Sequence, residues 1–80
     1  MLKQAPVNFV IETEQEEDGR WIAEISDLPG SLVYGETQKQ AIVKVQALAL
    51  RVIADQLEHE EISTELTSLS FVAAQFKATV

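Results

Sequence analysis

The chain has 80 residues, 46% hydrophobic and 24% charged, a composition that predicts a single folded domain over residues 1–80 and excludes long disorder. Thirteen acidic and six basic residues give a net charge of -7, which argues against direct nucleic-acid binding and favours a basic partner. The absence of cysteine excludes disulfides, a thiolate nucleophile and cysteine-containing zinc sites.

The first two predicted strands form a hairpin. Their apolar residues occupy alternate positions: Val7, Phe9 and Ile11 in the first strand, and Trp21, Ala23 and Ile25 in the second. Pro6 is expected to mark the beginning of the first strand. The acidic tract at residues 14–17 leads into Asp18-Gly19, a dipeptide typical of a turn between two antiparallel strands.

The segment that follows connects this hairpin to a helix. Leu28-Pro29-Gly30 predicts a turn, because proline fixes its own φ angle and glycine tolerates a positive one. Residues 32–34 then predict a short third strand. Thr37 is expected to cap the helix, and Gln40 three positions later completes a capping box.

A helix is expected from Gln38 to about Glu58, because this stretch lacks glycine and proline and is rich in alanine and leucine. Its apolar residues form two adjoining stripes. One stripe is Ala41, Val45, Leu48 and Val52 with Ile42, Ala49 and Ile53, and the other is Val43, Ala47, Leu50, Ala54 and Leu57. Two interpretations of the second stripe are open: it meets another subunit or partner, or the chain termini wrap back over it.

The predicted fold is completed by a last strand. Residues 58–65 are polar and indicate a connection, and residues 66–76 alternate as a half-buried strand. Because a helix between two strands is usually a right-handed crossover, this strand should lie parallel to the first. The fold class is therefore α+β in the order β-β-β-α-β: a three-stranded antiparallel meander, a long helix and a fourth strand, with the helix on one face of a mixed four-stranded sheet.

The face of this sheet away from the helix is expected to mix apolar and polar side chains. It carries Val10, Ile22 and Val72 among Glu12, Glu24 and Ser70. Such a face is too polar for a core and too apolar for an ordinary solvated surface, so we expect an interface there.

A series of motifs within residues 7–58 resembles the HicB antitoxin family. In chain order the motifs are Phe9-Val10-Ile11-Glu12, an acidic turn that ends at Gly19, Trp21-Ile22-Ala23-Glu24-Ile25, Asp27-Leu28-Pro29-Gly30, Tyr34-Gly35-Glu36-Thr37, and Ala41 at the start of the helix. The resemblance implies a partial ribonuclease-H-like fold. It also implies a partner, HicA, a small basic ribonuclease with a double-stranded-RNA-binding-domain-like fold that cuts messenger RNA with a histidine. The implied activity is inhibition of that enzyme by masking.

The chain departs from this family in two places. Ser31 stands where members often have cysteine after the Leu-Pro-Gly turn, an exchange of small residues that leaves the fold prediction intact. Many members also carry a C-terminal helix-turn-helix or ribbon-helix-helix domain, and the residues after Phe76 are too few for one. The chain is therefore similar to the single-domain members, and we do not expect it to repress its own operon.

Catalysis by the chain itself is not expected. Ribonuclease-H-like enzymes hold metal with carboxylates on the first strand, the helix and the fourth strand, and residues 67–76 contain no carboxylate. The acidic residues of the first hairpin are interpreted as a solvated turn, or as groups that steer a basic partner. His59, the only histidine, is expected near the helix C-terminus as a cap. No catalytic, metal or cofactor site is therefore predicted.

The leading functional hypothesis is an antitoxin-like module that binds a HicA-like basic ribonuclease, with neither nucleic acid nor a membrane as a partner. Its predicted contact residues are Trp21, Glu24, Tyr34 and Glu36, although Trp21 suits a hydrophobic core as well as an interface. The alternative is an orphan homo-oligomer that lacks a toxin and self-associates through the second helix stripe and the free sheet face. With no visible signal peptide and no apolar run long enough to cross a bilayer, we expect a cytoplasmic protein.

Overall fold

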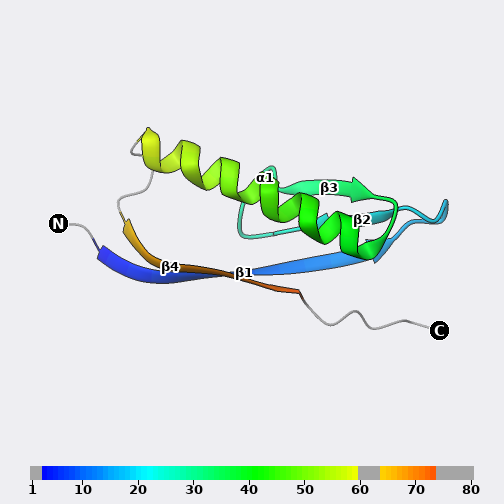
Figure 1. Cartoon of the computed structure of the whole chain (residues 1–80), viewed down its shortest axis with the longest axis horizontal. Coiled ribbons are helices and arrows are strands. Elements are labelled where there is room, and N and C mark those ends of the chain that lie inside the picture. Colours follow the sequence, from blue (N-terminus) through cyan, green and yellow to red (C-terminus); the bar gives the residue numbers. More distant parts are fainter. Residues whose placement is uncertain (1–2, 60–63, 74–80) are drawn as a thin grey trace.

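A computed structural model describes residues 3–59 and 64–73. Over these residues the chain forms four strands and one helix: β1 (Lys3–Gln15), β2 (Trp21–Glu24), β3 (Leu32–Gly35), α1 (Gln38–Glu58) and β4 (Thr64–Ala73). The strands make one sheet in the order β3-β2-β1-β4, and α1 packs against one face of it (Figure 1). The predicted α+β fold in the order β-β-β-α-β is confirmed.

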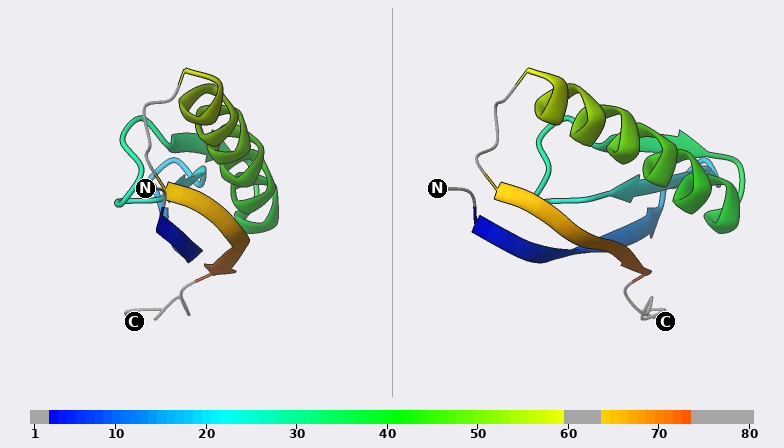
Figure 2. Two further views of the ribbon diagram at one scale, coloured as in Figure 1. Left: turned by 90° about the vertical axis from the view of Figure 1, so that its left-hand side faces the viewer. Right: turned by 60° about the vertical axis from the view of Figure 1, so that its left-hand side comes forward.

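The strand β1 belongs to two different pairings. Its C-terminal part, Glu12–Gln15, pairs antiparallel with β2, which in turn pairs antiparallel with β3. Its remaining length, from Lys3 to Ile11, pairs parallel with β4, as the crossover rule predicts. Figure 2 shows β4 running alongside β1, while β2 and β3 lie nearer the C-terminal end of β1. The long first strand therefore joins the meander to the parallel pair.

Two strand boundaries differ from the predicted ones. β1 begins at Lys3, so Pro6 lies inside the strand, and the pairing with β4 shifts register between Ala5 and Pro6. Such an irregularity accommodates a residue that has no backbone N–H to donate. β4 begins at Thr64, so residues 64–65 belong to the strand, where the parallel pairing with β1 extends it beyond the apolar pattern. The predicted continuation from Ala74 to Phe76 lies outside the described residues.

Both predicted turns are present. Gly19 and Gly30 have φ angles of 94° and 84°, which glycine adopts without the steric cost that a Cβ would add. The Gly19 N–H donates to the Glu16 carbonyl at 2.9 Å, and the Ser31 N–H donates to the Leu28 carbonyl at 3.1 Å. The turns fix where β1 passes into β2 and where β2 passes into β3.

Side chains satisfy the free backbone groups at the start of α1. The Thr37 hydroxyl accepts a hydrogen bond from the Gln40 N–H at 3.0 Å, and the Gln40 side-chain oxygen accepts one from the Glu36 N–H at 2.7 Å. The Gln38 amide donates to the Thr13 hydroxyl at 3.0 Å, which ties the first turn of the helix to β1. The predicted cap at Thr37 is confirmed, and Gln40 reaches the residue before it.

At the other end of α1, His59 is the C-terminal cap, as predicted. Its backbone N–H donates to the Asp55 carbonyl at 3.0 Å. The ring Nδ1 lies 2.8 Å from the same carbonyl oxygen and 3.2 Å from the Asp55 carboxylate. The histidine therefore completes the end of the helix.

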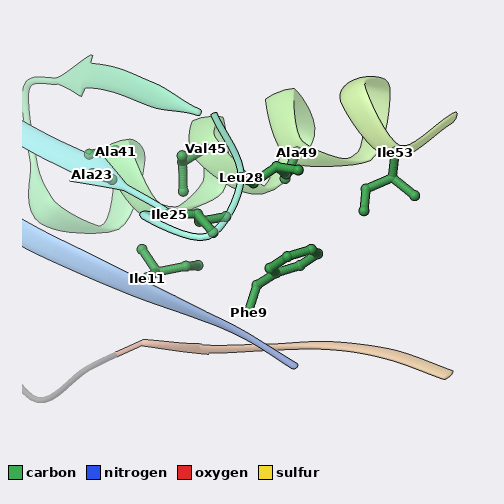
Figure 3. Packing of buried hydrophobic residues seen from close by; sticks show 9 residues of the cluster. All are labelled: Phe9, Ile11, Ala23, Ile25, Leu28, Ala41, Val45, Ala49 and Ile53. Atoms are coloured by element: carbon green, nitrogen blue, oxygen red, sulfur yellow. The ribbon is translucent and has the colours of Figure 1, made fainter. Parts of the chain in front are cut away.

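The hydrophobic core lies between α1 and the sheet (Figure 3). Every fourth residue of the helix is buried in it, because positions i and i+4 share one helix face: Ala41, Val45, Ala49 and Ile53. The sheet side contributes Phe9, Ile11, Ala23, Ile25 and Leu28. Two of the four helical residues are alanines, so the helix axis approaches the sheet closely.

Aromatic packing attaches β4 to this core. Phe9 of β1 and Phe71 of β4 are paired across the parallel ladder, with ring centroids 6.1 Å apart and a tilt of 31°. Leu69 pairs with Val7 one step along the same face, and both pack against the core cluster. The fourth strand is thus held by side-chain contact as well as by its backbone pairing.

Replacing Gly35 with alanine is expected to destabilise the fold. A Cβ at this position would lie 2.6 Å from the Ala41 backbone nitrogen and 2.8 Å from its Cα, so β3 and the helix would have to separate. We expect Gly35→Ala to lower the free energy of unfolding by about 1–3 kcal/mol in chemical denaturation. Lys39→Ala, at an exposed position of α1, is the control and should change it by less than about 0.5 kcal/mol. Equal effects of the two substitutions would contradict this account of the close contact.

Replacing Ser31 with alanine is expected to leave stability unchanged or to raise it. Ser31 is 2% exposed, and its hydroxyl finds no hydrogen-bond partner among the described residues. Removing a buried hydroxyl without a partner removes a desolvation cost of about 1–3 kcal/mol, offset in part by a small cavity. The check is the denaturation midpoint of Ser31→Ala, and a clear loss of stability would show that the hydroxyl contributes a favourable interaction.

Candidate functional site

The face of the sheet opposite α1 is the main candidate site. Side chains alternate along each strand, so the neighbours of the buried core positions point away from the helix. We call this surface the outer face and define it by Asn8, Val10, Glu12, Glu14, Ile22, Glu24, Leu32, Tyr34, Ser70 and Val72. All of them except the half-buried Ile22 are exposed. The predicted interface face therefore exists and is uncovered by the described residues.

Two carboxylates face each other near the middle of the outer face. Glu12 of β1 and Glu24 of β2 are direct partners in the antiparallel register, and Leu32 follows on β3. Like charges at opposed positions of a sheet destabilise it. The Ser26 hydroxyl donates to the Glu12 carboxylate at 3.0 Å, but neither carboxylate forms an ion pair with any described residue. The two groups together present uncompensated negative charge.

Exposed apolar side chains flank this charge on both sides. Val10 and Val72 are partners across β1 and β4, and Tyr34 is the partner of Ile22 across β3 and β2. Val10, Val72, Leu32 and Tyr34 are between 43% and 52% exposed. Exposed apolar side chains grouped in this way are typical of a surface that contacts another protein.

Arg20 covers one end of the outer face. Its guanidinium carbon lies 4.5 Å from the centre of the Tyr34 ring, within the range of a cation–π contact. The arginine also holds the turn: its backbone N–H donates to one Asp18 carboxylate oxygen at 3.0 Å and its Nε to the other at 2.8 Å. These two bonds, the backbone one first, lower the pKa of Asp18 below 3.8. Arg20 therefore orders the acidic turn and packs on the adjacent tyrosine.

The predicted contact residues do not all lie on one surface. Glu24 and Tyr34 belong to the outer face, and Glu36 is exposed just beyond the end of β3. Trp21 lies two positions before Ala23 on β2, so both side chains point to the helix side of the sheet. Trp21 is half-buried and packs against the core there.

Of the ten outer-face residues, only Glu24 and Tyr34 were among the predicted contacts, and the cross-strand alignment of Glu12, Glu24 and Leu32 was not anticipated. The Asp18-Gly19 dipeptide alone does not give this arrangement, because a two-residue turn there would place Thr13 opposite Glu24, whereas the observed register places Glu12 there. Leu32 lies next to Glu24 on β3, but the length of the loop before it had to be known to fix that pairing.

A second uncovered surface lies on α1. Val43, Leu50 and Leu57 are between 43% and 54% exposed, and Ala47 and Ala54 between them are exposed too. We call these five residues the helix stripe. None of the described residues covers it, so the second apolar stripe predicted from the sequence is a free surface in this structure.

Charge and apolar area are the main chemical features of these two surfaces. Within residues 3–59 and 64–73, no three histidine, aspartate or glutamate side chains gather closely enough to hold a metal ion. The helix α1 is not long and apolar enough to cross a membrane. The chemistry present on the outer face is negative charge and apolar area, both suited to contact with another protein.

Comparisons with protein-family models, with curated proteins and with solved structures found no match to this chain.

Replacing Arg20 with glutamine is expected to raise the pKa of Asp18 only in part, because the variant loses the guanidinium contact but keeps the backbone N–H bond that lowers this pKa most. Because this pKa is lowered in the folded state, the bonds to Arg20 stabilise the fold above the unfolded-state pKa, and the stabilisation is lost as the pH falls through the folded-state pKa. A carboxyl-carbon NMR titration of Asp18 in wild type and Arg20→Gln measures the shift. Lys39→Gln removes a distant positive charge and serves as the control. An Asp18 pKa that is the same in wild type and Arg20→Gln would contradict a contribution from the Arg20 side chain.

Proposed function

We infer that this chain is an antitoxin-like protein that binds a small basic ribonuclease of the HicA type through its outer face and masks the active site. The proposal includes membership of the HicB family with its partial ribonuclease-H-like fold, and action in the cytoplasm. It rests on the motifs that resemble that family and on the surface that the sheet leaves uncovered. In this proposal the chain supplies a binding surface and performs no chemistry of its own.

The observation that carries the proposal is the pair of opposed carboxylates at Glu12 and Glu24. Two like charges paired across strands cost stability in the free protein, and the described residues offer them no cation. A lysine or arginine of a partner placed between them would convert this repulsion into two charge-assisted contacts. A ribonuclease that binds messenger RNA carries such basic side chains at its active site.

The apolar part of the outer face supplies the remaining contact. The carboxylates and the net charge of -7 favour rapid encounter with a basic protein, whereas exposed apolar side chains lower the rate of dissociation once water is expelled. Val10 and Val72 lie on one side of the carboxylates and Leu32 and Tyr34 on the other. A partner seated over the carboxylates would therefore contact apolar area in both directions.

The proposal is tested by capturing the tagged protein from its own cells and assaying what it retains. We expect a small basic protein in stoichiometric amount, which cleaves RNA after separation and loses this activity when the antitoxin-like chain is added back. Recovery of the chain alone, from cells in which neighbouring genes are expressed, would favour the alternative of an orphan homo-oligomer. A retained protein without ribonuclease activity would overturn the assignment of its class.

Reversing the charge at Glu24 is expected to weaken this complex. Glu24→Lys should raise the dissociation constant about tenfold or more, because it replaces a favourable contact with repulsion at the centre of the face. Asp27→Lys, in the loop after β2, is the charge-matched control and should have a much smaller effect. The measurement is isothermal titration calorimetry with the purified ribonuclease.

The same titration separates the two predicted acidic contacts. Glu36 lies beyond the end of β3, so Glu36→Lys measures whether the interface extends past the sheet toward the start of α1. Equal affinities for wild type and Glu24→Lys would remove the outer face from the binding site, even if the partner is a ribonuclease.

A further inference from the structure

The helix stripe has the spacing of a coiled-coil seam. Its residues Val43, Ala47, Leu50, Ala54 and Leu57 are separated by four, three, four and three positions, which is the a/d pattern of a heptad repeat. All five are exposed, while the buried residues of α1 (Ala41, Val45, Ala49 and Ile53) already pack against the sheet. This spacing suits a second helix packed along the stripe.

Large and small residues alternate along the stripe. Leu50 and Leu57 are large and Ala47 and Ala54 are small, so a copy of the same helix running in the opposite direction can place leucine against alanine. In this alignment Leu50 faces Ala54 of the second copy, and Leu57 faces its Ala47. A two-fold axis generates both contacts twice, because each patch meets an identical patch.

The charges of α1 favour the same antiparallel arrangement. Lys39 and Lys44 lie in its N-terminal half and Asp55 and Glu58 near its C-terminus, which is the reverse of what the helix dipole favours, and Arg51 lies between these two groups. Antiparallel pairing brings Lys44 of one copy close to Glu58 of the other, on the flank of the stripe. Neither residue forms an ion pair within the part of the chain that is described.

The distribution of charge over the whole chain selects α1 as the surface for a second copy. The chain has a net charge of -7, but α1 holds three basic and two acidic residues. Two copies meeting through their outer faces would bring Glu12 and Glu24 of both copies together. If two copies pack through α1 instead, the interface forms on the part of the chain that has a net positive charge and carries both basic and acidic side chains.

We propose that the chain forms a homodimer in which two copies of α1 pack antiparallel through the helix stripe, about a two-fold axis near its middle. The helix α1 covers one face of the sheet (Figure 2), and the outer face is the opposite one, while the residues of the helix stripe are exposed. The dimer therefore leaves both outer faces accessible, and each copy can bind its own basic partner. The pairing does not depend on the identity or existence of that partner.

Light scattering and sedimentation of the purified chain test the pairing. We expect a molecular mass of twice 8.9 kDa for the wild type and a monomer for Leu50→Lys, which places a charge close to the axis. Leu32→Lys makes the same substitution on the outer face and is expected to remain a dimer. Circular dichroism checks that both variants are folded, which is expected because both positions are exposed. A monomeric wild type, or dissociation by Leu32→Lys alone, would overturn the proposal.

A charge exchange tests the antiparallel direction. Lys44→Glu and Glu58→Lys should each raise the dissociation constant of the dimer by roughly five- to tenfold, because symmetry places each altered pair in the interface twice. The double variant Lys44→Glu/Glu58→Lys restores opposite charges and should return the dissociation constant to within about twofold of wild type. Additive losses in the double variant would exclude the antiparallel contact.

Discussion

The structure depends on one strand that serves two pairings. β1 supplies its C-terminal part to an antiparallel hairpin with β2 and its remaining length to a parallel pair with β4. These two pairings are separated along the strand, so the sheet is extended, and one helix between β3 and β4 covers one face. Phe9 and Ile11 lie close to the point where the pairings meet, and both are buried in the core beneath the helix (Figure 3).

A single helix against a four-stranded sheet leaves two apolar surfaces uncovered, and their charges differ. The outer face carries opposed carboxylates, and Arg20 at one end of it is already paired with Asp18, so a second copy is repelled at the carboxylates and a basic protein is attracted. The helix stripe is flanked by both signs, so it is complementary to itself when reversed. Charge, more than apolar area, therefore decides which kind of partner suits each surface.

The sequence predicted most of the fold because its local rules agree with each other. Asp18-Gly19, Leu28-Pro29-Gly30 and the cap at Thr37 each specify a backbone conformation from a few neighbouring residues. The strand ends were less predictable, because pairing with a distant strand extended β1 and β4 into segments without an alternating pattern. In the candidate site, Glu24 lies on the exposed face that its place in the strand alternation predicts, while Trp21 lies on the same side of β2 as Ala23 and packs on the helix side. Which acidic residue opposes Glu24 required the register of the hairpin.

The exposed surfaces also follow from the size of the chain. Of the nine hydrophobic residues that are buried in the described part, three are alanines, so the core contributes modest burial for a domain of 80 residues. Leucines, valines and a tyrosine remain outside it on two faces. Any partner that binds only the folded chain stabilises it by mass action, and contact on either face would add apolar burial that the chain cannot supply alone. Because the core buries little apolar area, the binding of a partner would contribute to the stability of the fold.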